Sequence, residues 1–564
     1  MALDNWFSNW PPPFLEQPYQ EPIKNLSTQY HGVKPPPIHH FLPLFMSLNV
    51  LHPPERKPQT NHKNFGQSVS FPPHVPFKKR KSRPDNQQKA QSHVSSTILG
   101  FNNPFDEDVW PKIPIETENF NENSNSWTND VSVETEKPII RNSSNYIPYE
   151  EEHKLKPLEV TGHFKTWYRW KVLDFAYPSA YARSRAISNK QYIPENNLPL
   201  GIEVYKNRIF ISMPKWKPGV PVTLAQLPRV PKEESPLLVP YPNWEWHSER
   251  TCDVITSVFR MQADNCGRLW VLDSGKISIT TEEAKQHCPP KLLIFDLETD
   301  ELLDKYVFPD SFIKEDGLYS NIILDMRNDN CDDIYAYMSD VWRFGLVTFR
   351  LLDHHAWRVT DHLFFPDPLA SYYKLHHLEF EWTDGLFGLA LSPLDKYHDD
   401  RLLYFHPMSS YREFLVKTSY LRNETHHDKD VFQVLGQSRG PSSHISSSVM
   451  DDNGIMYHLL VTRDSIGCWD SRKPYRRENL GIIAKSSKTL VFPNDIRLDQ
   501  EKKQSMWIIT NRLPYYLIEG LNTEMINFRV LSAYADESIK GTICDPQVGT
   551  KYPYYQPSND LDCY

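Results

Sequence analysis

From about Thr161 onward, the chain alternates short apolar runs with turns rich in Asp, Asn and Gly. The phrase GRLWVLDS from Gly267 shows the pattern, since it is entered from DNC and followed by Gly275. A single strand of this kind does not bury such residues alone, so the pattern indicates a larger β architecture.

Six units with one internal order follow each other along the chain. Each has an apolar strand, a polar turn, a second strand such as RLWVLDS, DIYAYMSD, RLLYFHP or MWIITN, and then a run resembling LLIFDL or LVTFRL. They begin near Leu198, Ser257, Asn321, Gly385, Ser442 and Leu490. A double β-sandwich also has short strands at regular spacing, but a repeated order favours small sheets arranged radially. The sequence predicts an all-β, six-bladed β-propeller over residues 159–550, with GRLWVLDSG as an inner strand of the second blade whose Trp and Leu fill the wedge between blades.

The first 158 residues differ in composition: Pro, Asn, Gln, Ser, Lys and His dominate, and apolar residues do not recur with a sustained period of 2 or 3.6. Such a composition does not bury enough apolar surface to offset its conformational entropy. We therefore expect a disordered N-terminal region over residues 1–158 and a short C-terminal tail over 551–564.

Net charge and hydropathy limit the classes of partner and the location that the sequence predicts. The 564 residues carry a formal net charge of −9 with no basic face outside one short run, KKRKSR from Lys78, so no nucleic-acid partner is expected, and small cationic ligands are better matched. The apolar stretch FLPLFMSLNVL from Phe41 is short and holds a proline, so no membrane span is predicted. The start, MALDNWFSNWPPPFLEQP, shows no secretory signal. Asn-x-Ser/Thr sequons stand at Asn25, Asn142 and Asn423, of which Asn423 is the predicted glycosylation site if the chain is secreted.

The sequence has none of the common enzyme motifs: no G-x-S-x-G, no glycine-rich phosphate loop, no H-E-x-x-H and no C-x-x-C. Ser443 and His444 are adjacent, and neighbours on an extended chain point to opposite faces. The paired histidines lack metal-ligand spacing and are interpreted as solvated loop residues, with His376 and Glu379 the one pair to test for metal. No metal and no cofactor are predicted.

Six phrases carry a family resemblance: LPLGIEVYKNRIFISMPKWKPGVPVTLAQLP, YPNWEWH, DNCGRLWVLDSG, CPPKLLIFDL, AYMSDVWRFGLVTF and LYFHPMSS. Together, from about Lys165 to about Pro546, the chain resembles the yellow / major royal jelly protein family of insects. The resemblance implies a secreted propeller with a ligand pocket at the channel mouth and a place in cuticle pigmentation and melanin formation. In this family some members accelerate dopachrome conversion, and salivary relatives bind biogenic amines.

The resemblance also implies disulfide bonds. Family-type bridges pair Cys266 with Cys331 and Cys468 with Cys544, each worth roughly 4 kcal/mol on chain-entropy grounds. Cys252 and Cys288 form a third bridge, and Cys563 is left unpaired.

The last blade offers a ligand site, because FPNDIR and ITNRLP flank one hairpin whose strand ends border the channel. Amide, carboxylate and carbonyl oxygens there suit a primary ammonium group, which only donates hydrogen bonds. In amine-binding relatives an Asn is followed two residues later by a position that offers its carbonyl, and Asn511-Arg512-Leu513 matches that order. The predicted ligand-binding set is Asn494, Asp495, Thr510, Asn511, Leu513 and Phe405.

For the aromatic wall and for the proton-transferring group, the sequence offers several alternative residues. Phe405, Tyr404, Trp342 and Tyr337 are candidates for stacking on a ligand ring, with core packing as the alternative. If the protein converts dopachrome, one positioned carboxylate or histidine suffices for proton abstraction. Asp495 is the first candidate and His444 the second.

Three functions follow from these expectations. The first is an extracellular binder of catechol or indole amines at the propeller channel. The second is an isomerase or tautomerase acting on dopachrome-like intermediates. The third is a structural or signalling protein of cuticle, with the cuticle matrix as its partner.

Overall fold

The computed structural model describes residues 156–248, 251–314, 316–327, 330–425 and 429–548. The expectations for residues 1–155 and 549–564 lie outside these described residues. They include nearly all of the predicted disordered region, the whole predicted C-terminal tail, the sequons at Asn25 and Asn142, and Cys563.

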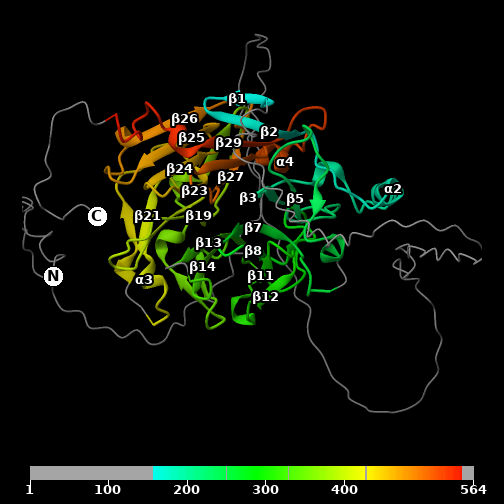
Figure 1. Ribbon diagram of the computed structural model, residues 1–564, viewed down its shortest axis with the longest axis horizontal. Coiled ribbons are helices and arrows are strands. Elements are labelled where there is room, and N and C mark those ends of the chain that lie inside the picture. The colour runs from blue at the N-terminus through cyan, green and yellow to red at the C-terminus, as the bar shows by residue number, and fades with distance from the viewer. Residues whose placement is uncertain (1–155, 249–250, 315, 328–329, 426–428, 549–564) are drawn as a thin grey trace, which may run out of the picture. The chain divides into compact units, whose positions relative to one another are not determined.

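Six antiparallel sheets follow one another around a common centre, and in Figure 1 the labels β7, β8, β11 and β12 run outward through one of them. The innermost strands are β3 (Gly201–Tyr205), β7 (Val258–Ala263), β13 (Tyr319–Met326), β19 (Leu386–Leu391), β23 (Ile445–Met450) and β27 (Pro493–Leu498). Each inner strand contacts the next, and β27 contacts β3, so the ring is closed. The predicted six-bladed β-propeller is confirmed.

Three more rings of strands surround the inner one. The second strands are β4 (Arg208–Ser212), β8 (Arg268–Asp273), β14 (Ile334–Asp340), β20 (Leu402–Pro407), β24 (Ile455–Leu460) and β28 (Ser505–Thr510). The third strands are β5 (Leu224–Pro228), β11 (Lys291–Asp296), β15 (Gly345–Arg350), β21 (Glu413–Lys417), β25 (Ser465–Asp470) and β29 (Phe528–Tyr534). The outer strands are β6 (Val239–Pro240), β12 (Leu302–Val307), β16 (His355–Thr360), β22 (Gln433–Leu435), β26 (Leu480–Lys485) and β2 (Phe164–Trp170), with β1 (Glu159–Thr161) beyond β2.

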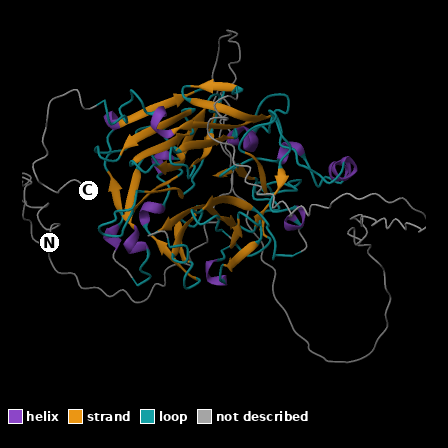
Figure 2. Ribbon diagram, in the orientation of Figure 1, coloured by secondary structure: helices purple, strands orange, loops and turns teal. Residues whose placement is uncertain are grey.

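Small elements lie outside the blade sheets. Two hairpins pair β9 (Lys276–Ile277) with β10 (Lys285–Gln286) and β17 (Tyr372–Leu375) with β18 (Leu378–Glu381). The helices are short and lie around the strands, as Figure 2 shows: α2 (Ala180–Ser188), α3 (Thr418–Leu421), α4 (Leu513–Ile518) and α5 (Ala535–Ser538). The 3₁₀ turns are η2 (Pro194–Asn196), η3 (Trp244–His247), η4 (Asp310–Phe312), η5 (His362–Phe364), η6 (Pro368–Ala370), η7 (Lys429–Val431) and η8 (Arg477–Asn479). Among the described residues, no helix has the length and apolar character needed to cross a membrane.

The phrase GRLWVLDS forms β8, which is the second strand of its blade, because β7 lies between it and the axis. Successive side chains of a strand point to opposite faces. Accordingly, Leu269 and Val271 pack with residues of the first blade, and Trp270 and Leu272 pack with residues of the third. The predicted wedge filling by Trp and Leu is therefore present, one strand further out than expected.

Strands from both ends of the described chain complete the last blade. β2 pairs with β29, so an N-terminal strand is the fourth strand of the sheet that holds β27 and β28. Across this junction the indole Nε1 of Trp167 donates to Ser532 Oγ at 2.7 Å. The unit pattern in the sequence did not predict this pairing, because nothing local links segments that far apart.

Three disulfide bonds link described residues, and all three match the pairing that the resemblance implied. Cys266 bonds to Cys331 and Cys468 to Cys544, with sequence separations of 65 and 76 residues. Cys252 bonds to Cys288. The first two bridges connect the second blade to the third, and the fifth blade to the segment after α5.

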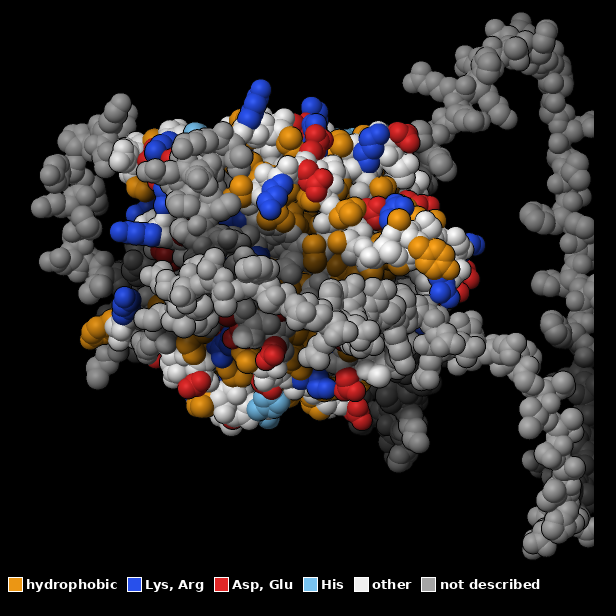
Figure 3. Space-filling view, turned by 45° about the vertical axis from the view of Figure 1, so that its right-hand side comes forward, with side chains coloured by type: hydrophobic (Ala, Val, Ile, Leu, Met, Phe, Trp, Pro, Cys, Tyr) orange, Lys and Arg blue, Asp and Glu red, His pale blue; other side chains and the backbone are white. Residues whose placement is uncertain are grey.

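The surface bears on two further expectations. On the face in Figure 3, basic and acidic side chains are interspersed, and the described part of that face has no basic stripe of the kind that binds nucleic acid. Asn423 is exposed just after α3, and its Oδ1 accepts hydrogen bonds from Thr425 N at 3.1 Å and Thr425 Oγ1 at 2.8 Å. Glycosylation at Asn423 stays a prediction.

Candidate functional site

A cavity of about 440 Å³ lies where loops from all six blades meet at one end of the channel. Three tryptophans and five phenylalanines supply most of its wall: Trp216, Trp342, Trp382, Phe259, Phe344, Phe380, Phe387 and Phe492. Rings in this wall pack on each other at angles, as where Trp216 and Phe259 have centroids 5.5 Å apart. Flat aromatic walls of this kind suit a flat, conjugated ligand.

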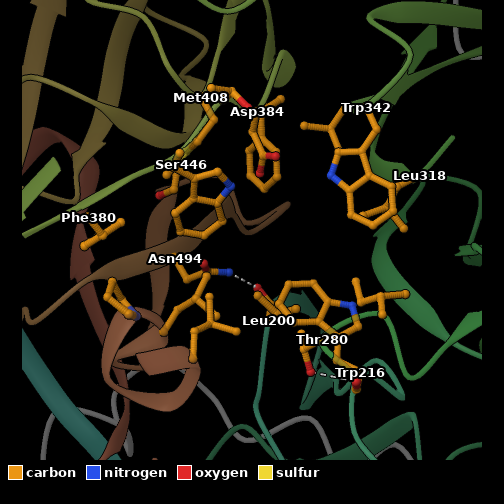
Figure 4. Close-up of a pocket in the computed structure, with 18 of the residues that line it drawn as sticks. Leu200, Trp216, Thr280, Leu318, Trp342, Phe380, Asp384, Met408, Ser446 and Asn494 are labelled. Atoms are coloured by element: carbon orange, nitrogen blue, oxygen red, sulfur yellow. Dashed lines mark hydrogen bonds between the residues drawn. The ribbon is translucent and has the colours of Figure 1, made fainter. Parts of the chain in front are cut away.

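Asp384 brings a carboxyl group to this aromatic wall. It lies between β18 and β19, and in Figure 4 it stands beside Trp342 and across the cavity from Asn494 and Leu200. The indole groups of Trp382 and Trp342 both hydrogen-bond to it. Burial among apolar groups nevertheless dominates and raises the pKa of Asp384 to about 7.

The backbone at Asp384 is fixed by the next residue. Gly385 donates its N–H to Val341 O at 3.0 Å and accepts from Met408 N at 2.9 Å. A Cβ at Gly385 would lie 2.2 Å from the Phe344 ring and 2.7 Å from Phe364 O, so only glycine fits here. This close approach of three segments holds the carboxyl group at a defined place on the wall.

Two hydroxyl groups also line the cavity with their protons already donated. Thr280 Oγ1 donates to Trp216 O at 2.9 Å, and Ser446 Oγ donates to Pro493 O at 2.7 Å. Each hydroxyl oxygen can therefore only accept a further hydrogen bond. The cavity thus presents acceptors to ligand N–H and O–H groups.

Among the described residues that line the cavity, the charged ones are Glu381 and Asp384, and none is Lys, Arg or His. Two buried cations stand behind aromatic wall residues instead. Lys276 Nζ lies 5.2 Å from the Trp342 ring and donates to Gly317 O, and Arg260 Cζ lies 5.0 Å from the Phe387 ring. The wall that a ligand meets is apolar and acidic.

Two of the predicted ligand-binding residues line this cavity, Asn494 and Leu513. Asn494 Nδ2 donates to Leu200 O at 2.5 Å, which leaves its Oδ1 as an acceptor. Leu513 begins α4, and its N–H donates to Asn511 Oδ1 at 3.1 Å. The side chain of Asn511 therefore caps this helix and does not line the cavity.

The other predicted residues lie outside the cavity lining. Asp495 is fully buried, accepts from Ile202 N at 3.1 Å and Ser447 Oγ at 2.9 Å, and pairs with Arg260. Thr510 is buried at the end of β28. Phe405 packs against Phe364, Phe414 and Phe432 between blades, which is the core-packing alternative.

The second proton-transfer candidate, His444, is also committed to the fold. Its ring stacks on Tyr373 at 3.7 Å, and its Nε2 contacts Ala370 O at 2.9 Å. Burial lowers the pKa of His444 to about 4, so its ring is neutral at physiological pH. His444 does not line the cavity.

Of the remaining aromatic candidates, Trp342 lines the cavity, while Tyr337 and Tyr404 are buried in clusters between blades. The predicted metal pair is not brought together, because His376 contacts Asp464 and Glu379 pairs with Lys374. Within the described residues, no group of three or more His, Cys, Asp or Glu side chains is arranged to hold a metal ion.

Asp384 and Trp382 were missed from the sequence, whereas Trp342 was among the predicted aromatic candidates. All predicted ligand-binding residues except Phe405 come from FPNDIR and ITNRLP, at the strand ends of the last blade. The same rule applied to the fourth blade would have selected Asp384, two residues before β19, within the phrase EFEWTDGLFG.

Comparisons with known proteins add to this geometry. The sequence profile of the major royal jelly protein family matches residues 256–544. A protein named dopaminechrome tautomerase from Drosophila melanogaster is 41% identical over 421 residues, which are 73% of this chain and 90% of that protein. Protein yellow from Drosophila erecta is 37% identical over 385 residues, 67% of this chain and 70% of that protein. Virginiamycin B lyase from Staphylococcus aureus aligns over 60% of this chain and 95% of its own at 8% identity and a TM-score of 0.32, a likeness that carries no argument.

Proposed function

The chain belongs to the major royal jelly protein family, and from this premise we propose that it is a tautomerase that converts dopaminechrome-like indoline quinones into dihydroxyindoles. The observation that carries the proposal is one carboxyl group, Asp384, whose pKa burial raises to about 7 on the wall of an aromatic cavity. A proton-transfer group acts best when its pKa lies near the working pH. The relative named dopaminechrome tautomerase supports the same reaction class.

The cavity suits such a substrate in shape. An indoline quinone is a flat, two-ring molecule, and a volume of about 440 Å³ lies within the range of small-molecule sites. The tryptophan and phenylalanine rings of the wall offer faces and edges for its ring. Acceptors at Thr280, Ser446 and Asn494 meet its N–H and the hydroxyl groups that form during the reaction.

The reaction balances with no external partner. The Asp384 carboxylate takes a proton from the saturated ring carbon attached to the quinone ring, the C–H electron pair moves into the conjugated system, and a quinone oxygen takes up a proton. A second transfer, from the neighbouring saturated carbon to the other quinone oxygen, completes the aromatic dihydroxyindole. Substrate and product are isomers, so neither an oxidant nor a reductant is consumed, and one group that accepts and returns a proton is sufficient.

This proposal replaces pure amine binding as the leading function, because amine binding needs no group with a pKa near 7. We place the activity in pigment formation outside cells. Family membership and three disulfide bonds support that location, since disulfides persist in oxidising compartments. A non-catalytic role in the cuticle matrix is the alternative that the assays below test.

The pH dependence of turnover is the first expected result. Asp384 must be ionised to take a proton, so kcat/KM should fall about tenfold for each pH unit below 7 and level off above it. An aspartate with its ordinary pKa near 4 would give a flat profile over that range. The measurement is the initial rate of dopaminechrome loss by the full chain between about pH 5 and about pH 8, with the uncatalysed rate subtracted. A flat profile contradicts the role of Asp384.

Substrate charge gives the second expected result. Dopachrome differs from dopaminechrome by a carboxylate, which would enter a wall whose charged residues are Glu381 and Asp384. Like charges about 5 Å apart repel by about 3 kcal/mol at the effective dielectric of a protein surface, and solvent screening reduces this. We expect kcat/KM for dopachrome to be about 10- to 100-fold below that for dopaminechrome.

The matched control is the methyl ester of dopachrome, which keeps the bulk and removes the charge. The ester should recover most of the rate. Equal rates for the acid and the ester would show that the acidic wall does not select. The amine-binding alternative is tested by measuring the unfolding temperature of the protein with dopamine present. If the protein converts none of the three quinones, which are dopaminechrome, dopachrome and the ester, the tautomerase proposal is contradicted.

A further inference from the structure

The β17–β18 hairpin stands apart from the blade sheets and leads directly into the acidic wall of the cavity. Its strands pair only with each other among the described residues. Phe380 and Glu381 at the end of β18 line the cavity, and the three residues that follow, up to Asp384, line it as well. The position of this hairpin, together with Gly385, therefore sets the position of the carboxyl group.

At the tip of the hairpin, Leu375 and Leu378 are buried in the core, and His376 makes two polar contacts to separate elements. Its Nε2 lies 2.6 Å from Asp464 Oδ2, and its Nδ1 lies 2.7 Å from the Tyr515 hydroxyl. Asp464 lies between β24 and β25 of the fifth blade, whereas Tyr515 lies on α4, which follows β28 of the last blade. One imidazole ring thus joins the hairpin to two other parts of the propeller.

Each partner of His376 is attached to a different part of the cavity wall. Asp464 accepts a hydrogen bond from the backbone N–H of Phe492, which lines the cavity. Tyr515 belongs to α4, whose residues Leu513, Pro514, Leu517 and Ile518 line the cavity too. His376 therefore connects three segments of the wall at one point.

The chemistry of the three groups explains why histidine suits this position. A carboxylate only accepts hydrogen bonds, so Nε2 carries the proton that Asp464 takes. In a neutral ring Nδ1 is then an acceptor, and it takes the Tyr515 hydroxyl proton. No other side chain offers a rigid donor and a rigid acceptor on opposite sides of one ring.

We propose that His376 is a positioning residue that keeps the hairpin closed on the cavity, so that Asp384 stays in apolar surroundings. The inference rests on the proposed function of Asp384 as the proton-transfer group. The base of the hairpin is held separately, because the Tyr373 hydroxyl donates to Met408 O at 3.0 Å and its ring stacks on His444. Loss of His376 therefore loosens the tip and admits water without unfolding the blade.

The neighbouring residue His377 supplies a matched control. Its Nε2 lies 2.8 Å from Glu519 Oε1, but the two side chains are 64% and 45% exposed. Exposed pairs of this kind contribute little to stability.

The titratable and charged groups around the two sites are Asp464, Tyr515, Arg512, Glu519 and Lys485 near His376, and Tyr373 and Glu381 near Asp384.

The test is a pH titration of tryptophan fluorescence in the full chain, because Trp342 and Trp382 both hydrogen-bond to Asp384. Subtracting the Asp384→Asn titration isolates the step that belongs to this carboxyl group. The wild type should show a midpoint at about pH 7. In His376→Ala water enters and the midpoint should fall by about one unit toward the ordinary Asp value. Tyr515→Phe, which removes one oxygen atom, should give a smaller shift in the same direction.

Activity on dopaminechrome provides the second readout. His376→Ala should lower kcat about tenfold with little change in KM, since a misplaced group loses rate more than binding. His376→Gln, which keeps a donor near Asp464, should recover part of the rate, and His377→Gln should match the wild type.

The outcomes separate the inference from the function on which it rests. If the Asp384-dependent midpoint and kcat are the same in His376→Ala as in His377→Gln, the positioning role is wrong while the proposed function stands. A wild-type titration with no Asp384-dependent step near neutral pH contradicts the proposed function itself, and the positioning role with it.

Discussion

Replacing Asp384 with asparagine should lower kcat for dopaminechrome tautomerisation about 10³-fold, which is within the usual contribution of a general acid–base group. The side chain keeps its size, and its amide oxygen still accepts from an indole N–H. What it loses is the ability to take a proton from carbon at neutral pH. KM should change little, because aromatic contacts supply most of the binding.

The stability of the Asp384→Asn variant shows whether its loss of activity comes from unfolding. Burial raises the pKa of Asp384 above its unfolded value, so the folded state binds more protons between about pH 4 and about pH 7, and its stability falls as the pH rises through that window. The asparagine variant lacks this loss. Its Tm at about pH 8 should therefore equal or exceed that of the wild type, as measured by calorimetry.

Glu379→Gln is the matched control for charge removal. Glu379 lies on the same hairpin, pairs with Lys374 and does not line the cavity, so its variant should retain wild-type kcat. A fully active Asp384→Asn protein would eliminate the carboxyl mechanism. Equal losses in both variants would point to a general disturbance of the hairpin instead.

Removing the Cys468–Cys544 bond should produce the largest loss of stability among the changes considered. The bond closes a loop of 76 residues, and in the chain-entropy view this is worth about 4 kcal/mol. Both cysteines are fully buried, so alanine at the two positions also leaves unfilled space. For a fold of this size we expect the Tm of the double alanine variant to fall by about 5 °C or more in calorimetry.

The Cys252–Cys288 bond is the natural comparison. It closes a shorter loop of 36 residues, and Cys252 is exposed, so its double alanine variant should lose less stability. An equal or larger loss there would show that loop length and burial do not govern these bridges.

Much of the architecture was readable from the sequence because it depends on local pattern. Short apolar runs such as that in GRLWVLDS, with polar turns at each end and repeated in one order, predicted the blades and the packing of Trp270 between them. The disulfide pairs came from the family resemblance and are confirmed. The pairing of β2 with β29 could not be predicted from the sequence, because neither strand carries a signal that identifies a partner some 360 residues away.

The candidate site was harder to predict because side-chain direction at strand ends depends on tertiary packing. Asn511 has the expected residue type and place, but its oxygen caps the first N–H of α4. Asp495, one residue after Asn494, is turned toward Arg260 and a neighbouring strand. Asp384 reaches the cavity because the β17–β18 hairpin and Gly385 bring it there, and neither the hairpin nor its His376 contact has a local pattern that predicts it.

The last blade combines β2 with strands from the other end of the described chain, and this affects how the protein folds while it is being synthesised. The ribosome delivers β2 long before β29, so β2 leaves the exit tunnel without the strand that will pair with its inner edge. Blades one to five can form in order as they emerge, whereas the ring stays open until residue 534 is available. Until then β2 presents an unpaired strand edge, the kind of surface that chaperones must shield from other nascent chains. A chain that stops before β29 retains that edge permanently, however complete its other blades are.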